Sequence, residues 1–121
     1  MKTKQYGDNG EDIAVHFLEQ KGYTIVDRNW HNGHKELDIV ARTGNTLVFI
    51  EVKRRSTELY GNAADAINER KIRCLVDAAN RYIKRYAIDL ECRFDVITVT
   101  GIGAKMCIEH IENAFIPPIW N

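Results

Sequence analysis

The sequence contains few cysteines and no long apolar segment. Its three cysteines, Cys74, Cys92 and Cys107, are odd in number, far apart and outside any CxxC pair. This argues against a disulfide framework and against a zinc site, and it suits a reducing compartment. No stretch approaches the roughly 20 apolar residues that a membrane-spanning helix needs, and residues 1–12 hold no apolar signal segment. We therefore expect a soluble, cytoplasmic protein.

Net charge is also lacking, because 17 basic residues balance 17 acidic ones. The overall charge argues neither for nor against nucleic acid as a partner, so only local clustering of charge is informative. Hydrophobic residues make up 45% of the 121 residues and charged residues 28%, which is typical of a globular protein. The length predicts a single domain over residues 1–121, able to bury roughly two-thirds of its unfolded surface.

The pattern of apolar residues predicts an α/β fold with a central mixed sheet of about five strands flanked by helices. The predicted helices span 8–21 and 64–87, and the predicted strands span 23–30, the two arms of a hairpin within 36–56, 93–100 and 106–112. The predicted order is therefore α-β-β-β-α-β-β. Short turns at 31–35 and 101–105 separate the remaining strands.

Glu11 lies near the start of the first predicted helix. With Asp8 as the N-cap it would complete a capping box, and Gly22 suits the C-cap. Glu11 also shares one helical face with Ala14 and Leu18, so it lies at the edge of the apolar stripe. Because a helix N-terminus is electropositive, this end could instead face an acidic site and add a carboxylate to it.

The segment ELDIVARTGNTLVFIEVKRRS, residues 36–56, predicts a hairpin with a two-residue turn at Gly44-Asn45. In that register the numbers of paired residues sum to 89, so Asp38 faces Glu51 and Glu36 faces Lys53. Alternation along a strand places these four charges on one face. The opposite face would then hold the apolar residues Leu37, Ile39, Val48, Ile50 and Val52.

The facing carboxylates of Asp38 and Glu51 need compensation. Like charges with Cβ atoms roughly 5 Å apart destabilise a sheet, whereas Glu36 opposite Lys53 is favourable. A shared proton, an arginine or a divalent cation could compensate, and Mg²⁺ favours one or two carboxylates with waters and phosphate oxygens. Charged strand residues most often form a solvated face. Residues 47–52, however, are almost continuously apolar, as in a covered central strand, where charges more often mark a functional site.

The ExD–turn–ExK hairpin behind a GED helix resembles the PD-(D/E)xK arrangement of restriction-endonuclease-like nucleases. More closely, the chain resembles the YraN-like family of small bacterial proteins. The matching segments are GEDIA, GY, RNW, ELDIVA, VFIEVKRRS, YGNAADAI, RFDVITV and IEHIENAF, which together cover nearly the whole chain. The order and spacing of these segments carry the resemblance, since no single one is very specific.

The resemblance implies a fold similar to that of archaeal Holliday-junction resolvases and a nuclease site that uses Mg²⁺ or Mn²⁺. By this resemblance Asp38 and Glu51 would be metal ligands, Lys53 the catalytic lysine and Glu11 an accessory acid. Family members usually have glycine before the glutamate of the first hairpin strand, where this chain has Lys35. That extra cation would either weaken metal binding or add a phosphate contact.

Basic residues near the hairpin and on the second predicted helix could bind nucleic acid. Lys53, Arg54 and Arg55 are expected to leave the site together, and four basic residues of the helix fall within about 80° of one another. The alternative is an ordinary solvated face. The predicted nucleic-acid-binding residues are Lys53, Arg54, Arg55, Arg70, Lys71 and Arg73, with Arg81 and Lys84 on the same basic helix face.

Two classes of function remain open from the sequence. The first is a metal-dependent DNA endonuclease that hydrolyses phosphodiester bonds, with a preference for DNA structure. The second is a non-catalytic nucleic-acid-binding module or an interaction subunit of a DNA-processing complex. A weak homodimer would suit either, formed through the apolar tail residues Phe115, Ile116, Ile119 and Trp120, unless the tail covers its own sheet edge.

Overall fold

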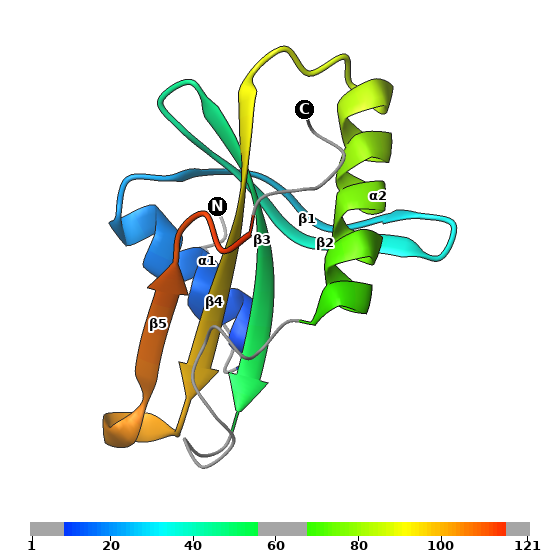
Figure 1. Cartoon of the computed structure of the whole chain (residues 1–121). Coiled ribbons are helices and arrows are strands. Elements are labelled where there is room, and N and C mark those ends of the chain that lie inside the picture. Colours follow the sequence, from blue (N-terminus) through cyan, green and yellow to red (C-terminus); the bar gives the residue numbers. More distant parts are fainter. Residues whose placement is uncertain (1–8, 56–67, 116–121) are drawn as a thin grey trace, which may run out of the picture.

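One sheet, whose strands lie in chain order, organises the protein (Figure 1). The computed structural model describes residues 9–55 and 68–115. Within them the elements are α1 (Gly10–Gln20), β1 (Thr24–Asn32), β2 (Lys35–Thr43), β3 (Thr46–Arg55), α2 (Glu69–Arg85), β4 (Glu91–Thr100), the 3₁₀ turn η3 (Gly103–Lys105) and β5 (Cys107–Ile111). The predicted order α-β-β-β-α-β-β is confirmed, and it is compatible with a restriction-endonuclease-like fold.

The sheet has the order β1-β2-β3-β4-β5 and is mixed. Only β3 and β4 run parallel, while the other three neighbouring pairs are antiparallel. A parallel pair needs a long crossover, and α2 lies in the connection between these two strands (Figure 1). No helix in residues 9–55 and 68–115 has the length and apolar character needed to cross a bilayer.

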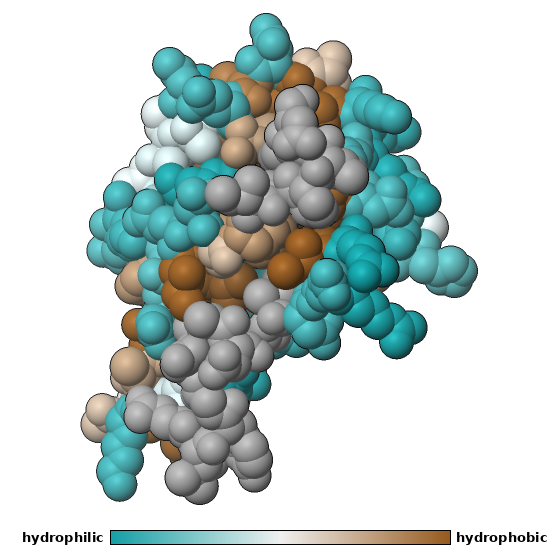
Figure 2. Space-filling view, in the orientation of Figure 1, coloured by the Kyte–Doolittle hydropathy of each residue, from teal (hydrophilic) through white to brown (hydrophobic). Residues whose placement is uncertain are grey.

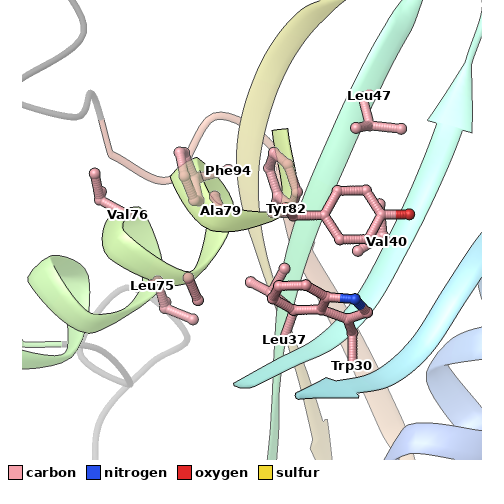
Figure 3. Packing of buried hydrophobic residues seen from close by; sticks show 11 residues of the cluster. Trp30, Leu37, Val40, Leu47, Leu75, Val76, Ala79, Tyr82 and Phe94 are labelled. Atoms are coloured by element: carbon pink, nitrogen blue, oxygen red, sulfur yellow. The ribbon is translucent and has the colours of Figure 1, made fainter. Parts of the chain in front are cut away.

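Each face of the sheet is covered by one helix. On one face, α2 packs its buried residues against Trp30, Leu37 and Val40 (Figure 3). On the other face, α1 packs against Ile39, Val48 and Ile50. Residues 47–51 of β3 are consequently all buried, which confirms the prediction of a covered central strand. The outer side of α2 carries hydrophilic side chains (Figure 2).

Local sequence signals fix the ends of α1. Its N-cap is Asn9, whose side chain accepts a hydrogen bond from the Asp12 backbone, and not Asp8, which lies outside the described residues. Gly22 adopts a φ of +93° and ends the helix, with the Tyr23 amide bonded to the Leu18 carbonyl. The predicted buried residues of this helix are thus held against the sheet.

The start of α2 differs from the prediction. Helix 64–87 was expected, but Asn68 is extended and caps a helix that begins at Glu69. The Asn68 side chain accepts a hydrogen bond from the Lys71 backbone at 2.9 Å. A side-chain cap of this kind stops the helix from continuing toward its N-terminus. Residues 64–67 lie outside the described part of the chain.

The predicted register of the β2–β3 hairpin is confirmed from the turn as far as Ile39 and Ile50. Beyond that pair the expected ladder does not continue. Asn29 of β1 has a φ of +47° and lies opposite Asp38, between the pairs Arg28–Ile39 and Trp30–Leu37. A left-handed residue disturbs the two-residue alternation of a strand. The facing of side chains therefore changes at this step.

Two predictions for the hairpin are wrong because of that change. Leu37 does not share the α1 face with Ile39, but packs with Trp30 in the α2 core (Figure 3). Glu36 does not pair with Lys53. Instead it is paired with His31 of β1, with 3.7 Å between His31 Nδ1 and a Glu36 carboxylate oxygen.

A buried polar cluster fastens β5 to β4. Asp95 has a fully buried side chain that accepts hydrogen bonds from Arg93 at 2.9 and 2.8 Å, from His110 Nε2 at 2.7 Å and from the Asn113 backbone at 2.9 Å. Burial opposes ionisation, yet these donors hold the pKa of Asp95 below its usual value. Asp95 is therefore a structural carboxylate on β4 that holds the edge strand β5 in place.

Phe115 folds back onto its own chain. Its ring stacks on that of Phe94 with centroids 4.8 Å apart, and it packs against the α2 core. This contact fits the expectation that the tail covers its own sheet. The other tail residues proposed for an interface, Ile116, Ile119 and Trp120, lie outside the described residues.

Candidate active site

The candidate site lies where β2 and β3 separate. Below the Ile39–Ile50 pair, the backbone N–H of Val52 donates a hydrogen bond to Asp38 Oδ2 at 2.9 Å. A carboxylate side chain therefore accepts the amide of the central strand at a point where the ladder has ended. This bond fixes Asp38 beside β3, and hence beside Glu51.

Glu51 is a carboxyl group buried in the sheet. Its side chain is 5% exposed. Burial, followed by the hydrogen bond and the negative charge of Asp38, raises the pKa of Glu51 to about 8, while the charge of Lys71 opposes that rise. The side chains of Asp38 and Glu51 thus interact, although the ladder that predicted their pairing ends at Ile39 and Ile50. Two adjoining carboxyl groups of this kind share a proton or need a cation.

Lys71 supplies that cation from α2. Its Nζ lies 3.1 Å from Glu51 Oε2. Among residues 9–55 and 68–115, Glu51 Oε2 is a buried oxygen that accepts no well-formed hydrogen bond, and its contact with Lys71 is that of an ion pair. Partial burial lowers the pKa of Lys71, but the charges of Glu51, Asp38 and Glu36 outweigh it and raise the pKa overall. Sequence reasoning had assigned Lys71 to nucleic acid alone and missed this ion pair.

Glu11 approaches the same carboxylates from the start of α1. Its pKa is raised by burial, opposed by Arg28, and raised further by the charge of Asp38. Arg28 Nε lies 3.1 Å from Glu11, and the same guanidinium pairs with Asp12. Arg28 therefore holds Glu11 in place within electrostatic range of Asp38. Arg28 belongs to the RNW segment, but the sequence assigned it no role at the site.

The three basic residues at the end of β3 do not leave the site together. Alternation places Lys53 on the α2 face with Glu51, and Arg54 on the α1 face. Arg54 Cβ lies so close to Gly10 that a Cβ added at Gly10 would come within 3.2 Å of it. Gly10 thus lets α1 approach β3, and Arg54 is turned away from the carboxylate pair. Arg55, like Lys53, falls on the α2 side.

Lys71, which contacts Glu51, also lines an open pocket of about 280 Å³. The lining residues of this pocket are His34, Lys35, Glu36, Lys71, Cys74 and Leu75. Lys35 forms an ion pair with Asp77 of α2 at 3.2 Å. Arg70 and Arg73 are exposed nearby on the same helix, and Arg73 pairs with Glu69 at 3.8 Å. The pocket is therefore bordered by more basic than acidic side chains.

The carboxylate pair fits a magnesium-type site better than a zinc-type site. Across residues 9–55 and 68–115, no group of three histidine, cysteine or acidic side chains is arranged to hold a metal ion. Mg²⁺ commonly binds through one or two carboxylates and keeps several waters. Asp38 and Glu51 supply two carboxylates, and Glu51 Oε2 is a buried oxygen that accepts no hydrogen bond. Oxygen atoms of this kind are the ligands to which Mg²⁺ binds in proteins.

Comparison with known proteins gives one consistent result. The family model "Uncharacterised protein family UPF0102" matches residues 10–99. A UPF0102 protein of Phocaeicola vulgatus is 47% identical over 116 residues, covering 96% of both chains. One of Bacteroides thetaiotaomicron is also 47% identical with the same coverage. One of Porphyromonas gingivalis is 46% identical over 90% of this chain and 82% of its own.

Proposed function

This chain belongs to the uncharacterised protein family UPF0102, the YraN-like family that its motifs resemble, and from the geometry of its carboxylate pair we propose that it is a Mg²⁺- or Mn²⁺-dependent DNA endonuclease. One observation carries the proposal. Glu51 Oε2 is buried without a hydrogen bond, beside the carboxylate of Asp38. Two adjoining carboxylates match the charge of a divalent cation better than that of the single ammonium of Lys71, so this arrangement favours a metal site.

Asp38 and Glu51 would hold the metal. A bound divalent ion would polarise a phosphodiester and lower the pKa of an attacking water. Asp38 is already oriented by the Val52 amide, so its position does not depend on the ion. Glu51 is fixed by its burial in the central strand. The protein thus offers two preorganised oxygen donors at the end of a hairpin ladder.

Lys53 and Glu11 complete the proposed chemistry. Lys53 shares the face of Glu51 on β3, where its ammonium would stabilise the negative charge that develops on the phosphate. Glu11 would act as an accessory acid held by Arg28. DNA would bind across the basic side chains beside the site, with the reaction taking place in the cytoplasm.

Cleavage assays test the proposal directly. Labelled four-way junction, flap, single-stranded and duplex DNA are incubated with Mg²⁺ or Mn²⁺ and, separately, with EDTA. We expect hydrolysis of at least one substrate that stops with EDTA and is lost in Asp38→Asn and Lys53→Met. Glu91→Gln is the matched control, because Glu91 is an exposed carboxylate at the start of β4 and pairs with Thr46, at the opposite end of β3 from Glu51 and Lys53.

Two outcomes contradict the endonuclease. Cleavage that persists in EDTA, or in Asp38→Asn, does not come from this site. Salt-dependent DNA binding without cleavage of any substrate would instead identify a non-catalytic binding module.

A weak homodimer that DNA strengthens is part of the same proposal. Cutting a branched DNA requires action on two strands, which a symmetric pair of sites supplies. Sedimentation of the protein alone and with a four-way junction tests this. A monomer in both samples at micromolar concentration would leave a single-strand nicking role.

A further inference from the structure

Lys71 occupies the position at which a cation is expected. Its ammonium lies 3.1 Å from Glu51 Oε2, the same buried oxygen that accepts no hydrogen bond. A short polar side chain could not reach this carboxylate from α2, whereas the four-carbon stem of lysine can. The ion pair lets the protein keep Glu51 in its core without a metal.

We propose that Lys71 is an exchangeable counter-ion, which leaves Glu51 when a divalent cation binds and then contacts a phosphate of the nucleic acid. The inference rests on the proposed metal site, and it assigns that site a second lysine besides Lys53. It also links metal binding to DNA binding through one side chain.

Electrostatics requires the exchange. Two cations within contact distance of one carboxylate oxygen repel each other strongly, and little water screens them here because the Glu51 side chain is 5% exposed. A bound ion would therefore displace the ammonium. The Lys71 side chain is 37% exposed, so its path to solvent is open. Its backbone is fixed by the Asn68 cap, and only the side chain has to move.

The released ammonium has a destination beside the site. Lys71 lines the open pocket together with His34 and Lys35. It lies in the first turn of α2, where the helix dipole favours an anion. In this pocket Lys35 is paired with Asp77 and Glu36 with His31, so Lys71 adds a positive charge to the pocket when it leaves Glu51. A phosphate next to the scissile one is the anion that this arrangement suits.

Metal affinity is the first test. Isothermal titration of Mn²⁺ into the protein is compared for wild type, Lys71→Met and Arg73→Gln. Removal of a competing cation should raise the Mn²⁺ affinity of Lys71→Met by about 5- to 150-fold, the usual range of coupling between two sites. The metal-free melting temperature of that variant should fall. Arg73→Gln removes a charge from the same helix that pairs, among the described residues, with exposed Glu69, and both quantities should match wild type.

A second charge control separates competition from a general electrostatic effect. Lys53→Met removes a positive charge from the same face of β3, but no ion pair joins Lys53 to Glu51. Its gain in Mn²⁺ affinity should be clearly smaller than that of Lys71→Met. Unchanged affinity in Lys71→Met, or an equal gain in both variants, would overturn the proposal.

The salt dependence of DNA binding is the second test. The affinity of the protein for duplex DNA is measured at several salt concentrations, with and without Ca²⁺. Ca²⁺ takes the place of Mg²⁺ or Mn²⁺ so that the DNA is bound but not cleaved. Each phosphate contact steepens the log–log slope by about 0.9. On adding Ca²⁺, the slope of wild type should steepen by about 0.9 more than that of Lys71→Met. Equal steepening would refute the phosphate contact.

Both tests measure binding and not cleavage, so their results can support or contradict this inference separately from the endonuclease proposal. Tighter Mn²⁺ binding by Lys71→Met in a protein that cleaves nothing supports the exchange and contradicts the nuclease. If the protein cleaves DNA but Lys71→Met binds Mn²⁺ with wild-type affinity, the endonuclease is supported and the exchange of Lys71 is contradicted. If Lys71→Met does not fold, Lys71→Gln keeps polar donors without the charge and serves in both measurements.

Discussion

Replacement of Asp95 by asparagine should strongly destabilise the protein. Its two oxygens accept four hydrogen bonds from Arg93, His110 and the Asn113 backbone, and its side chain is fully buried. Asparagine keeps one acceptor oxygen but turns an NH₂ group toward donors. Two of the four bonds are then lost, and Arg93 loses its buried counter-charge.

The expected cost follows from that geometry. Removal of one partner from a buried ion pair typically costs about 3–5 kcal/mol. For a protein of 121 residues the unfolding entropy is about 0.25 kcal/mol/K, so the melting temperature should fall by about 12–20 °C. Calorimetry at pH 7 measures the shift. The control is Glu112→Gln, since Glu112 also contacts Arg93, at 3.5 Å, but is 53% exposed and should contribute less than about 1 kcal/mol.

The pH dependence checks the mechanism. Because the pKa of Asp95 is lowered in the folded state, its contribution to stability is present above the unfolded value of 3.8. It is lost as the pH falls through the folded pKa. The difference in melting temperature between wild type and Asp95→Asn should therefore be constant above about pH 5 and shrink below pH 4. Equal melting temperatures at pH 7, or a gap that widens in acid, would refute the role assigned to this carboxylate.

Three further predictions concern other positions. Without metal, Asp38→Asn should melt at the same temperature as wild type or higher, and Mn²⁺ should no longer stabilise it. A clearly lower melting temperature without metal would mean that the carboxylate is structurally required. Gly101→Ala should cost about 1–3 kcal/mol, because its φ is +81° and the added Cβ would lie 2.5 Å from a backbone oxygen; Gly103→Ala, with open space around it, should cost less in the same urea titration. Arg28→Met should raise the pKa of Glu11 measured by NMR, since Arg28 now lowers it; an unchanged pKa would exclude the contact.

Local signals made much of the fold predictable. The turn at Gly44-Asn45 fixes the first hairpin pairs, because glycine there tolerates a φ of +57°. Counting from that turn brings Asp38 to Glu51 without any knowledge of the remaining chain. The continuous apolar run of β3 likewise predicted that both faces of the sheet would be covered.

The missed features depend on contacts between distant segments. Asn29 shifts the facing of β1 and β2, and an asparagine in left-handed conformation has no sequence signature that separates it from other asparagines. The ion pair of Lys71 with Glu51 depends on how the crossover returns α2 to the sheet. Arg28 reaches Glu11 across 17 residues of sequence. The periodicity of apolar residues cannot predict such contacts, since it describes one helix or strand at a time.

The hydrogen bond from the Val52 amide to Asp38 makes the NMR signal of that amide a probe of the Asp38 side chain in the wild-type protein. Most amides of β3 are protected from solvent exchange by the ladder, but this one is protected by a side chain. Its deuterium exchange rate therefore follows rotation of one carboxylate, while the amides around Ile50 follow opening of the sheet. Hydrogen exchange followed by NMR at these two amides can therefore measure the motion of the site separately from the unfolding of the protein.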